Sequence, residues 1–470
     1  MNFQILSHAS LVVRAAGTTL LIDPWILGSC YWRSWWNYPP VDPALMDGLQ
    51  PDAIYLSHVH WDYFHGPTLK KFPRDTHIYI PYERSPRVRR DLLRLGFKNI
   101  RELDHGAGVK LADDFRITSY QFASPWGDSA LIIEAEGVTL FDANDSKLMG
   151  APLRQILKRH GAIDFAFRNH SSANDRICTQ YTDDDEEYTE DPTQYIDSFM
   201  WFMNKVQPKY AIPFASSCCH LHRDVYNLNS FVMTPSLVKE RIDEQGGLVA
   251  SELKIMLSGD SWDSGEGFSI AEHTWFSDRE AHLEQYREQV ADKLEQTYAK
   301  EDSIDIQLKD FEHFFRKFFA AVPGFRKRAL RDKPLAFCAT TSSSRKWFLV
   351  DMAEECVSEI DADSLPEHAI VYEAPAAILK HVLAANMFSH AGISKRVIYR
   401  CRKADAPYLA QWKVLLAASE YDAIPLSQLF SWRTFKSYWP RWREILVYLY
   451  VIWKRRSGLT LREIEAELQR

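Results

Sequence analysis

The side chains best suited to chemistry lie in one short run, SHVHWDYFH, which spans residues 57–65. The apolar residues 53–56 precede it and predict a buried strand. His58 and His60 are two positions apart at the end of this strand, so their side chains point to the same side. Imidazole and carboxylate groups suit zinc, iron or manganese. We therefore expect His58, His60 and Asp62 to bind a metal ion, with a plain polar turn as the alternative.

The same run resembles the metallo-β-lactamase superfamily signature His-x-His-x-Asp-His. Residues 8–13 (HASLVV) and 20–25 (LLIDPW) resemble the opening strands and Asp-Pro turn of its UlaG-like branch. Residues 140–146 (LFDANDS) resemble the strand that ends in the metal-bridging aspartate, which is Asp145 here. Further segments resemble the metallo-β-lactamase-like part of CMP-N-acetylneuraminate hydroxylase, over about residues 1–270: 23–25, 35–36, 67–71, 207–209 and 213–215.

This resemblance implies an α/β protein, an αββα metallo-β-lactamase sandwich with a smaller α+β C-terminal domain. It also implies one or two transition-metal ions, zinc or iron, with Asp145 between them and Asp62 orienting a metal-bound hydroxide or binding the second ion. The hydroxylase family carries an N-terminal Rieske iron–sulfur domain. This sequence starts directly at the lactamase-like strands, so we expect no Rieske chemistry here.

Some ligand positions of the family are changed in this chain. The final histidine of the signature is Tyr63 here, and the last metal histidine corresponds to Ala215. We expect Tyr63 to act in catalysis as a hydrogen-bond donor to the substrate, because a phenol replaces a neutral imidazole ligand only at high cost.

Other histidines are candidates to replace the missing ligands. His65 ranks first, because a helix starting after Asp62 would place it one turn further on, on the same face. His222 ranks next, since the related hydroxylases also have a histidine shortly after this Pro-Phe-Ala segment. His170 and His220 are further candidates, and the alternative for residues 218–222 is an ordinary His-rich loop.

An aromatic loop at residues 31–38 follows the Asp-Pro turn. Aromatic faces stack on sugars, rings and acyl chains and exclude water. We expect Trp32, Trp35 and Trp36 to bind the substrate, a small molecule with a sugar, acyl or aromatic part. The alternative is a hydrophobic patch that a second domain buries.

The chain divides into four predicted segments. Residues 1–275 form the metal-binding domain, 276–302 a charged helical connector, 303–430 a unit that faintly resembles sterol-carrier-like domains, and 431–470 a basic aromatic helical tail. Within the third segment, residues 373–387 predict an amphipathic helix. The third segment is a candidate to hold an apolar ligand or to form a homodimer. We expect the tail to dock on its own domain or on a partner subunit, with contact to an acidic lipid surface as the alternative.

Composition indicates a cytoplasmic enzyme. The chain has 470 residues, a net charge of -7 and a sequence pI near 6.2, which argues against nucleic acid as a partner. Seven irregularly spaced cysteines are typical of a reducing compartment. The longest late apolar run, residues 445–453, is too short to span a membrane, which takes about twenty residues. We expect no membrane contact.

Three classes of function remain open. The first is a hydrolase that uses a metal-bound hydroxide, made possible because a bound metal lowers the pKa of water from 15.7 to about 7. The second is a non-haem oxygenase with one or two iron ions, related to CMP-N-acetylneuraminate hydroxylase, which the changed ligand set favours. The third is a non-catalytic binding protein, which the lost histidines favour.

Overall fold

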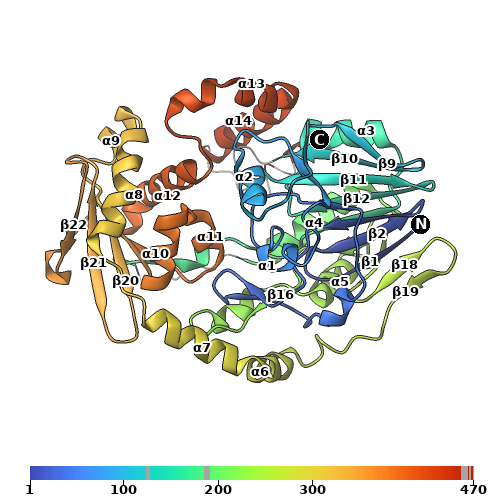
Figure 1. Cartoon of the computed structure of the whole chain (residues 1–470), viewed down its shortest axis with the longest axis horizontal. Coiled ribbons are helices and arrows are strands. Elements are labelled where there is room, and N and C mark those ends of the chain that lie inside the picture. The colour runs from blue at the N-terminus through green and yellow to red at the C-terminus, as the bar shows by residue number, and fades with distance from the viewer. Residues whose placement is uncertain (123–126, 185–190, 457–463, 465–466, 469–470) are drawn as a thin grey trace.

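The computed structural model describes residues 1–122, 127–184, 191–456, 464 and 467–468. Two stacked sheets form one end of the molecule, and a third sheet with its helices forms the other (Figure 1). Helices α6 (Arg279–Gln289) and α7 (Ala291–Asp302) run along one side between these two ends, and α13 (Trp432–Tyr438) and α14 (Trp442–Arg456) lie across the top. The chain is therefore an α/β protein.

The first sheet carries the strand that precedes the histidine run. Its order is β19-β18-β1-β2-β3-β6-β7-β8, and β3, β6, β7 and β8 run parallel. Its strands are β1 (Asn2–Ile5), β2 (Leu11–Ala15), β3 (Thr18–Ile22), β6 (Ala53–Tyr55), β7 (His77–Pro81), β8 (Ile100–Leu103), β18 (Ser261–Asp263) and β19 (Gly267–Ser269).

The second sheet carries the predicted aspartate strand. Its order is β17-β15-β13-β12-β11-β10-β9, with β12, β13, β15 and β17 parallel. Its strands are β9 (Gly108–Ala112), β10 (Phe115–Gln121), β11 (Ser129–Ala135), β12 (Val138–Asn144), β13 (Phe165–Arg168), β15 (Tyr210–Pro213) and β17 (Glu252–Leu253). A small sheet joins β4 (Ser29–Cys30), β5 (Trp35–Asn37) and β16 (Cys218–His220).

Alternating side chains bury the two large sheets against each other. Phe3, Leu11 and Ile22 of the first sheet share one core with Ile117 and Phe165 of the second. Helices cover the outer faces, because each sheet also presents apolar side chains on its other side. These helices are α1 (Gly66–Leu69), α2 (Arg87–Arg94), α3 (Gly150–His160), α4 (Thr193–Val206) and α5 (Pro235–Glu244).

The third sheet, in the order β14-β24-β23-β20-β21-β22, belongs to what we call the C-terminal unit, residues 303–430. Its edge strand β14 comes from residues 179–181, within the segment predicted for the metal-binding domain, and pairs parallel with β24. The strands are β14 (Thr179–Tyr181), β20 (Leu335–Thr340), β21 (Arg345–Asp351), β22 (Cys356–Ile360), β23 (Ile370–Pro375) and β24 (Ile398–Cys401).

An aromatic helix forms the core of the C-terminal unit. Helix α8 buries Phe311, Phe315 and Phe318 at helical spacing against the sheet. Each such burial contributes roughly 1.5–3 kcal/mol. The helices of the connector and of this unit are, in order, α6 (Arg279–Gln289), α7 (Ala291–Asp302), α8 (Leu308–Ala321), α9 (Gly324–Ala329), α10 (Ala376–Ala385), α11 (Phe388–Ile393) and α12 (Ala406–Glu420).

The predicted tail forms two helices, α13 (Trp432–Tyr438) and α14 (Trp442–Arg456), and its other residues lie mainly outside the described ones. Val447 of α14 is buried in the core that also contains α3. On the outer side, Trp432 and Trp439 are 75% and 69% exposed. The tail thus packs on its own chain with one face only.

No helix in the described part of the chain is both long and apolar enough to cross a membrane.

Candidate metal centre

The two parallel strands β3 and β6 position the histidine run. The Asp23 backbone N–H, directly after β3, donates to the carbonyl of Tyr55 at the end of β6 (3.0 Å). The Asp23 carboxylate accepts from the Ser57 N–H (2.7 Å), which fixes the start of the loop that carries His58 and His60. The site therefore lies at the carboxyl ends of these strands.

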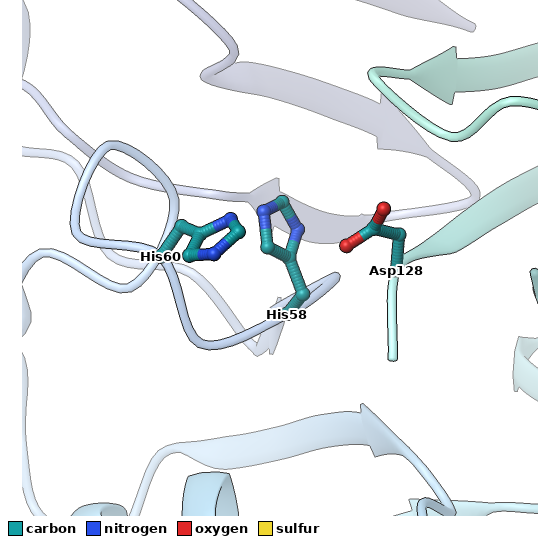
Figure 2. A group of neighbouring side chains, drawn as sticks. All are labelled: His58, His60 and Asp128. Atoms are coloured by element: carbon teal, nitrogen blue, oxygen red, sulfur yellow. The ribbon is translucent and has the colours of Figure 1, made fainter. Parts of the chain in front are cut away.

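His58, His60 and Asp128 form a group whose ligand atoms lie within 4.8 Å of one another (Figure 2). The two imidazoles come from one loop, and Asp128 approaches His58 from the segment before β11. Ser57 Oγ lies 2.9 Å from His58 Nδ1, and the Tyr421 hydroxyl lies 3.1 Å from His60 Nε2. These contacts leave His58 Nε2 and His60 Nδ1 as the nitrogens available to a metal.

The protonation of this group suits metal binding. Burial lowers the pKa of His58 to about 4 and that of His60 to about 3, so both rings are neutral at pH 7. Only a neutral imidazole can donate a lone pair to a metal ion. Burial also raises the pKa of Asp128 well above its usual value. A cation would relieve the cost of burying this carboxylate.

Asp145, directly after β12, reaches the same group. Its Oδ2 lies 3.6 Å from His58 Nε2. Asp145 Oδ1 and His58 Nε2 are both buried and have no hydrogen-bond partner among the described residues. Burial raises the pKa of Asp145 to about 6 and that of nearby Asp142 to about 7. Unpaired buried atoms of this kind fit a metal ion, because buried polar groups are otherwise paired.

Asp62 is held by two aromatic side chains. The Tyr31 hydroxyl donates to its Oδ1, and His8 Nε2 lies 3.2 Å from its Oδ2. Burial would raise the pKa of Asp62, but these contacts outweigh burial and lower it to about 2. The pKa of His8 is raised to about 9, because contacts with Asp62 and Cys218 outweigh the lowering by burial. Asp62 is thus an ionised, fixed carboxylate.

A small cavity of about 30 Å³ lies beside Asp62. Its lining includes His8, Asp62, Tyr63, Asp145 and His220. One water-sized particle takes about 10–15 Å³, so the cavity has room for an ion together with a water. Two carboxylates and two imidazoles therefore surround a second candidate position.

The structure does not bring His65 or His222 to this group. The helix expected after Asp62 instead begins at Gly66, and His65 is its N-cap, with Nδ1 2.8 Å from Thr68 Oγ1. His222 Nε2 lies 3.7 Å from Glu301, and its ring packs edge-on against Tyr298. Their assignment as metal ligands stays a prediction that this geometry does not favour.

Of the other expected residues, Tyr63 and His220 lie nearer to the candidate metal centre. Tyr63 packs on His58 with ring centroids 4.1 Å apart. His170 is fully buried, and the described residues offer no hydrogen-bond partner to either of its nitrogens. Burial, with the charge of His8 as a further cause, lowers the pKa of His170 to about 3. His220 lines the small cavity, so it is better placed than His222.

The aromatic loop mainly joins the two ends of the molecule. Trp35 Nε1 donates to the carbonyl of Ile393 (3.0 Å), and Trp32 Nε1 donates to His381 Nδ1 (3.1 Å). Trp36 is 1% exposed and packs near α6 and α7. Trp36 is thus buried, but by the connector helices rather than by the second unit, whereas Trp32 lines a cavity.

Residues of the C-terminal unit also reach the site. Besides the Tyr421 contact, His390 Nε2 lies 3.3 Å from the Val59 carbonyl, within the histidine run. His390 Nδ1 lies 2.9 Å from Glu420, which is itself 3.6 Å from Arg87. This buried network ties α11 and α12 to the loop that carries His60.

Sequence reasoning missed Asp128, His8 and Tyr421 as site residues. Asp128 lies far from residues 57–65 in the sequence, and only its place shortly before a predicted strand was a usable signal. His8 lies in the HASLVV segment that carried the resemblance. Nothing local marks Tyr421, which lies 361 residues from His60.

We expect Tyr421→Phe to weaken metal binding about tenfold, since partners that orient a ligating histidine typically contribute 10–100-fold. The change removes only the hydroxyl beside His60 Nε2. Titration with Zn²⁺ against a competing chelator measures the affinity. Tyr408→Phe, on helix α12, which ends directly before Tyr421, is the control, and equal affinities in both variants would contradict the positioning role.

Comparison with known proteins gives distant relatives only. No family model matches the sequence. A protein of Mycolicibacterium smegmatis that is named a Rieske 2Fe-2S iron–sulfur protein is 28% identical over 182 residues, which cover 37% of this chain and 35% of the relative. The cytidine monophosphate-N-acetylneuraminic acid hydroxylase of Mus musculus is 29% identical over 147 residues, 30% of this chain and 25% of the enzyme. The chain thus matches about a third or less of these relatives' lengths.

Solved structures align with about half of the chain. The isothiocyanate hydrolase from Delia radicum gut bacteria covers 56% of this chain and 99% of its own, with 19% identity and a TM-score of 0.42. A metallo-β-lactamase fold protein from Bacillus subtilis covers 56% and 98%, with 13% identity and a TM-score of 0.36. A diiron β-hydroxylase from Streptomyces venezuelae covers 54% and 52%, with 14% identity and a TM-score of 0.37.

These comparisons confirm the resemblance drawn from the motif: the chain has metallo-β-lactamase-fold structural neighbours and distant sequence similarity to CMP-N-acetylneuraminate hydroxylase and Rieske proteins.

Proposed function

We propose that this protein is a metal-dependent hydrolase built on the αββα metallo-β-lactamase sandwich, with a smaller α+β unit after it. One observation carries the proposal: two neutral imidazoles, one buried and one partly buried, and the Asp128 carboxylate converge within 4.8 Å at the ends of parallel strands. The unpaired Asp145 and His58 atoms beside them support a bound cation. Zinc and iron are the candidate ions.

The residues have distinct proposed roles. His58 through Nε2, His60 through Nδ1 and Asp128 through a carboxylate oxygen would hold the first ion, and Asp145 would link it to a second. A zinc or iron ion bound there would act as a Lewis acid and lower the pKa of water towards about 7. Asp62, fixed by Tyr31 and His8, would orient the attacking water. The Tyr63 hydroxyl would donate to the substrate.

A non-haem iron oxygenase is the second candidate. The group combines only two histidines with the carboxylates of Asp128, Asp145 and Asp62, and mixed ligands of this kind suit iron. The relative of Mus musculus that bears the name hydroxylase points to the same chemistry. The two functions differ in the metal that supports activity and in the co-substrate that is consumed, which is water for the hydrolase and oxygen for the oxygenase.

The test loads purified protein with Zn²⁺ or with Fe²⁺ and follows two readouts. A hydrolase will turn over 4-nitrophenyl esters or bis(4-nitrophenyl) phosphate without oxygen, and Asp145→Asn will lower kcat by about 100-fold or more, by analogy with other catalytic-group deletions. The exposed Asp113→Asn is the matched control. Oxygen uptake that requires iron, with no hydrolysis, would favour the oxygenase. A protein that binds no metal and turns over no substrate would instead be a binding protein.

A further inference from the structure

A cavity of about 580 Å³ lies within the C-terminal unit and reaches the candidate metal centre. His60 is the lining residue that belongs to the histidine run, and α11, α12 and residues 173–181 provide most of the remaining wall. Small-molecule sites usually measure about 300–1,000 Å³. The volume therefore suits a small organic group.

Helix α12 forms one wall with a regular stripe. Leu409, Lys413 and Ala417 line the cavity at intervals of four residues, and Tyr421 continues the stripe directly after the helix. Residues four apart lie on the same face of a helix, so these side chains form a continuous ridge. The ridge ends at the Tyr421 hydroxyl, 3.1 Å from His60 Nε2. Val414, which also lines the cavity, is 52% exposed, so we take it as the mouth of the cavity.

The wall is mostly apolar, and its three charged side chains are Asp175, Arg176 and Lys413. Arg176 interacts with another group of the chain, and Asp175 and Lys413 pair with each other. Lys413 Nζ lies 2.7 Å from Asp175 Oδ1, and the Tyr399 hydroxyl donates to Asp175 Oδ2 (2.8 Å). Lys413 also lies over the Tyr399 ring, 4.3 Å from its centroid. Because these two charges already satisfy each other, neither requires an opposite charge on a ligand. Apolar side chains such as Phe388 and Ile393 complete the surface.

We propose that this cavity binds an uncharged, apolar part of the substrate, an acyl chain or an aromatic ring, and places the group that reacts beside His60. The inference rests on the proposed function, because it takes His60 as part of the reaction centre. The C-terminal unit then sets substrate specificity for a centre that the two-sheet end of the molecule provides.

A second, larger cavity of about 1,040 Å³ is the competing site. It lies beside Trp32 and Trp61, and it includes neither His58 nor His60. Its lining also contains six charged side chains, against three in the first cavity: Arg33, Asp91, Arg94, Lys293, Lys300 and Glu301. It therefore suits a polar ligand better than an apolar one.

The test uses the full chain and N-phenyl-1-naphthylamine, an uncharged apolar dye whose fluorescence rises on burial. Val414→Trp at the mouth and Ala417→Phe at the inner end both fill the proposed cavity. Val414 is exposed, so its replacement tests the cavity even if Ala417→Phe fails to fold. The controls are Gln411→Phe, on the same helix outside the lining, and Ala377→Phe, in the larger cavity.

We expect each chain to bind one dye molecule. The affinity should fall about tenfold or more in Val414→Trp and Ala417→Phe, as the loss of a buried ring contact predicts. Both control variants should keep the wild-type affinity. Wild-type affinity in Val414→Trp and Ala417→Phe would overturn the inference, as would a loss confined to Ala377→Phe.

Proximity to the metal centre is measured separately. Protein loaded with paramagnetic Co²⁺ should broaden the NMR signals of the bound dye, and protein loaded with Zn²⁺ should not. Broadening supports the placement beside His60, and its absence in Co²⁺-loaded protein would overturn that placement. A protein that binds the dye in the expected pattern but binds no metal would instead overturn the proposed function and leave the apolar cavity standing.

Discussion

The double substitution His58→Ala with His60→Ala is expected to reduce the bound transition metal to less than about a tenth of the wild-type content, because a zinc or iron site needs four or more ligands and the change removes two. Both imidazoles come from one loop fixed by Asp23, so no neighbouring side chain can take their place without a backbone shift. Elemental analysis after dialysis against metal-containing buffer and then metal-free buffer gives the content.

A matched pair of exposed histidines provides the control for this experiment. His77→Ala with His368→Ala removes the same number of imidazoles from the surface and should leave the metal content unchanged. Full metal content in the His58/His60 variant, or equal losses in both variants, would show that the metal binds elsewhere.

Arg396→Met is expected to destabilise the protein by roughly 3–5 kcal/mol, the usual cost of removing one partner from a buried ion pair. The Arg396 side chain is 1% exposed and bonds both carboxylate oxygens of Glu301, at 2.8 and 2.6 Å. It also bonds Asp224 (3.0 Å) and the carbonyl of Trp32 (2.9 Å). One side chain therefore joins the C-terminal unit to α7, to the aromatic loop and to the segment after β16.

Urea unfolding, followed by tryptophan fluorescence, measures this effect. The exposed Arg331→Met is the control, and it should change the free energy of unfolding by less than about 0.5 kcal/mol. A loss below about 1 kcal/mol in Arg396→Met would contradict the anchoring role, because that is the range of exposed ion pairs.

Local patterns predicted the elements that carry the ligands. The apolar run at residues 53–56 matches β6 (Ala53–Tyr55), and the predicted strand before Asp145 matches β12 (Val138–Asn144). Both patterns depend on neighbouring residues, so they are readable in sequence. The helix predicted over residues 373–387 is shorter, Ala376–Ala385, because the residues up to Pro375 belong to strand β23.

Contacts between distant segments were not readable in the same way. His65 was expected one helical turn beyond Asp62, yet its ring caps α1 through Thr68, since a capping side chain competes with any other role. Tyr421 and His390 reach the histidine run only because the C-terminal unit folds against it. The aromatic loop carries the composition of a binding site, but its Trp35 bonds another part of the same chain.

The most direct test of the metal centre is a crystal structure of the metal-loaded protein with anomalous diffraction data collected at the metal edge. The account predicts a peak within about 2.0–2.2 Å of His58 Nε2, as zinc–nitrogen and zinc–oxygen bonds require, with His60 and Asp128 as further ligands. A peak at another group of residues such as His222 and Glu301, with none beside His58, would contradict it.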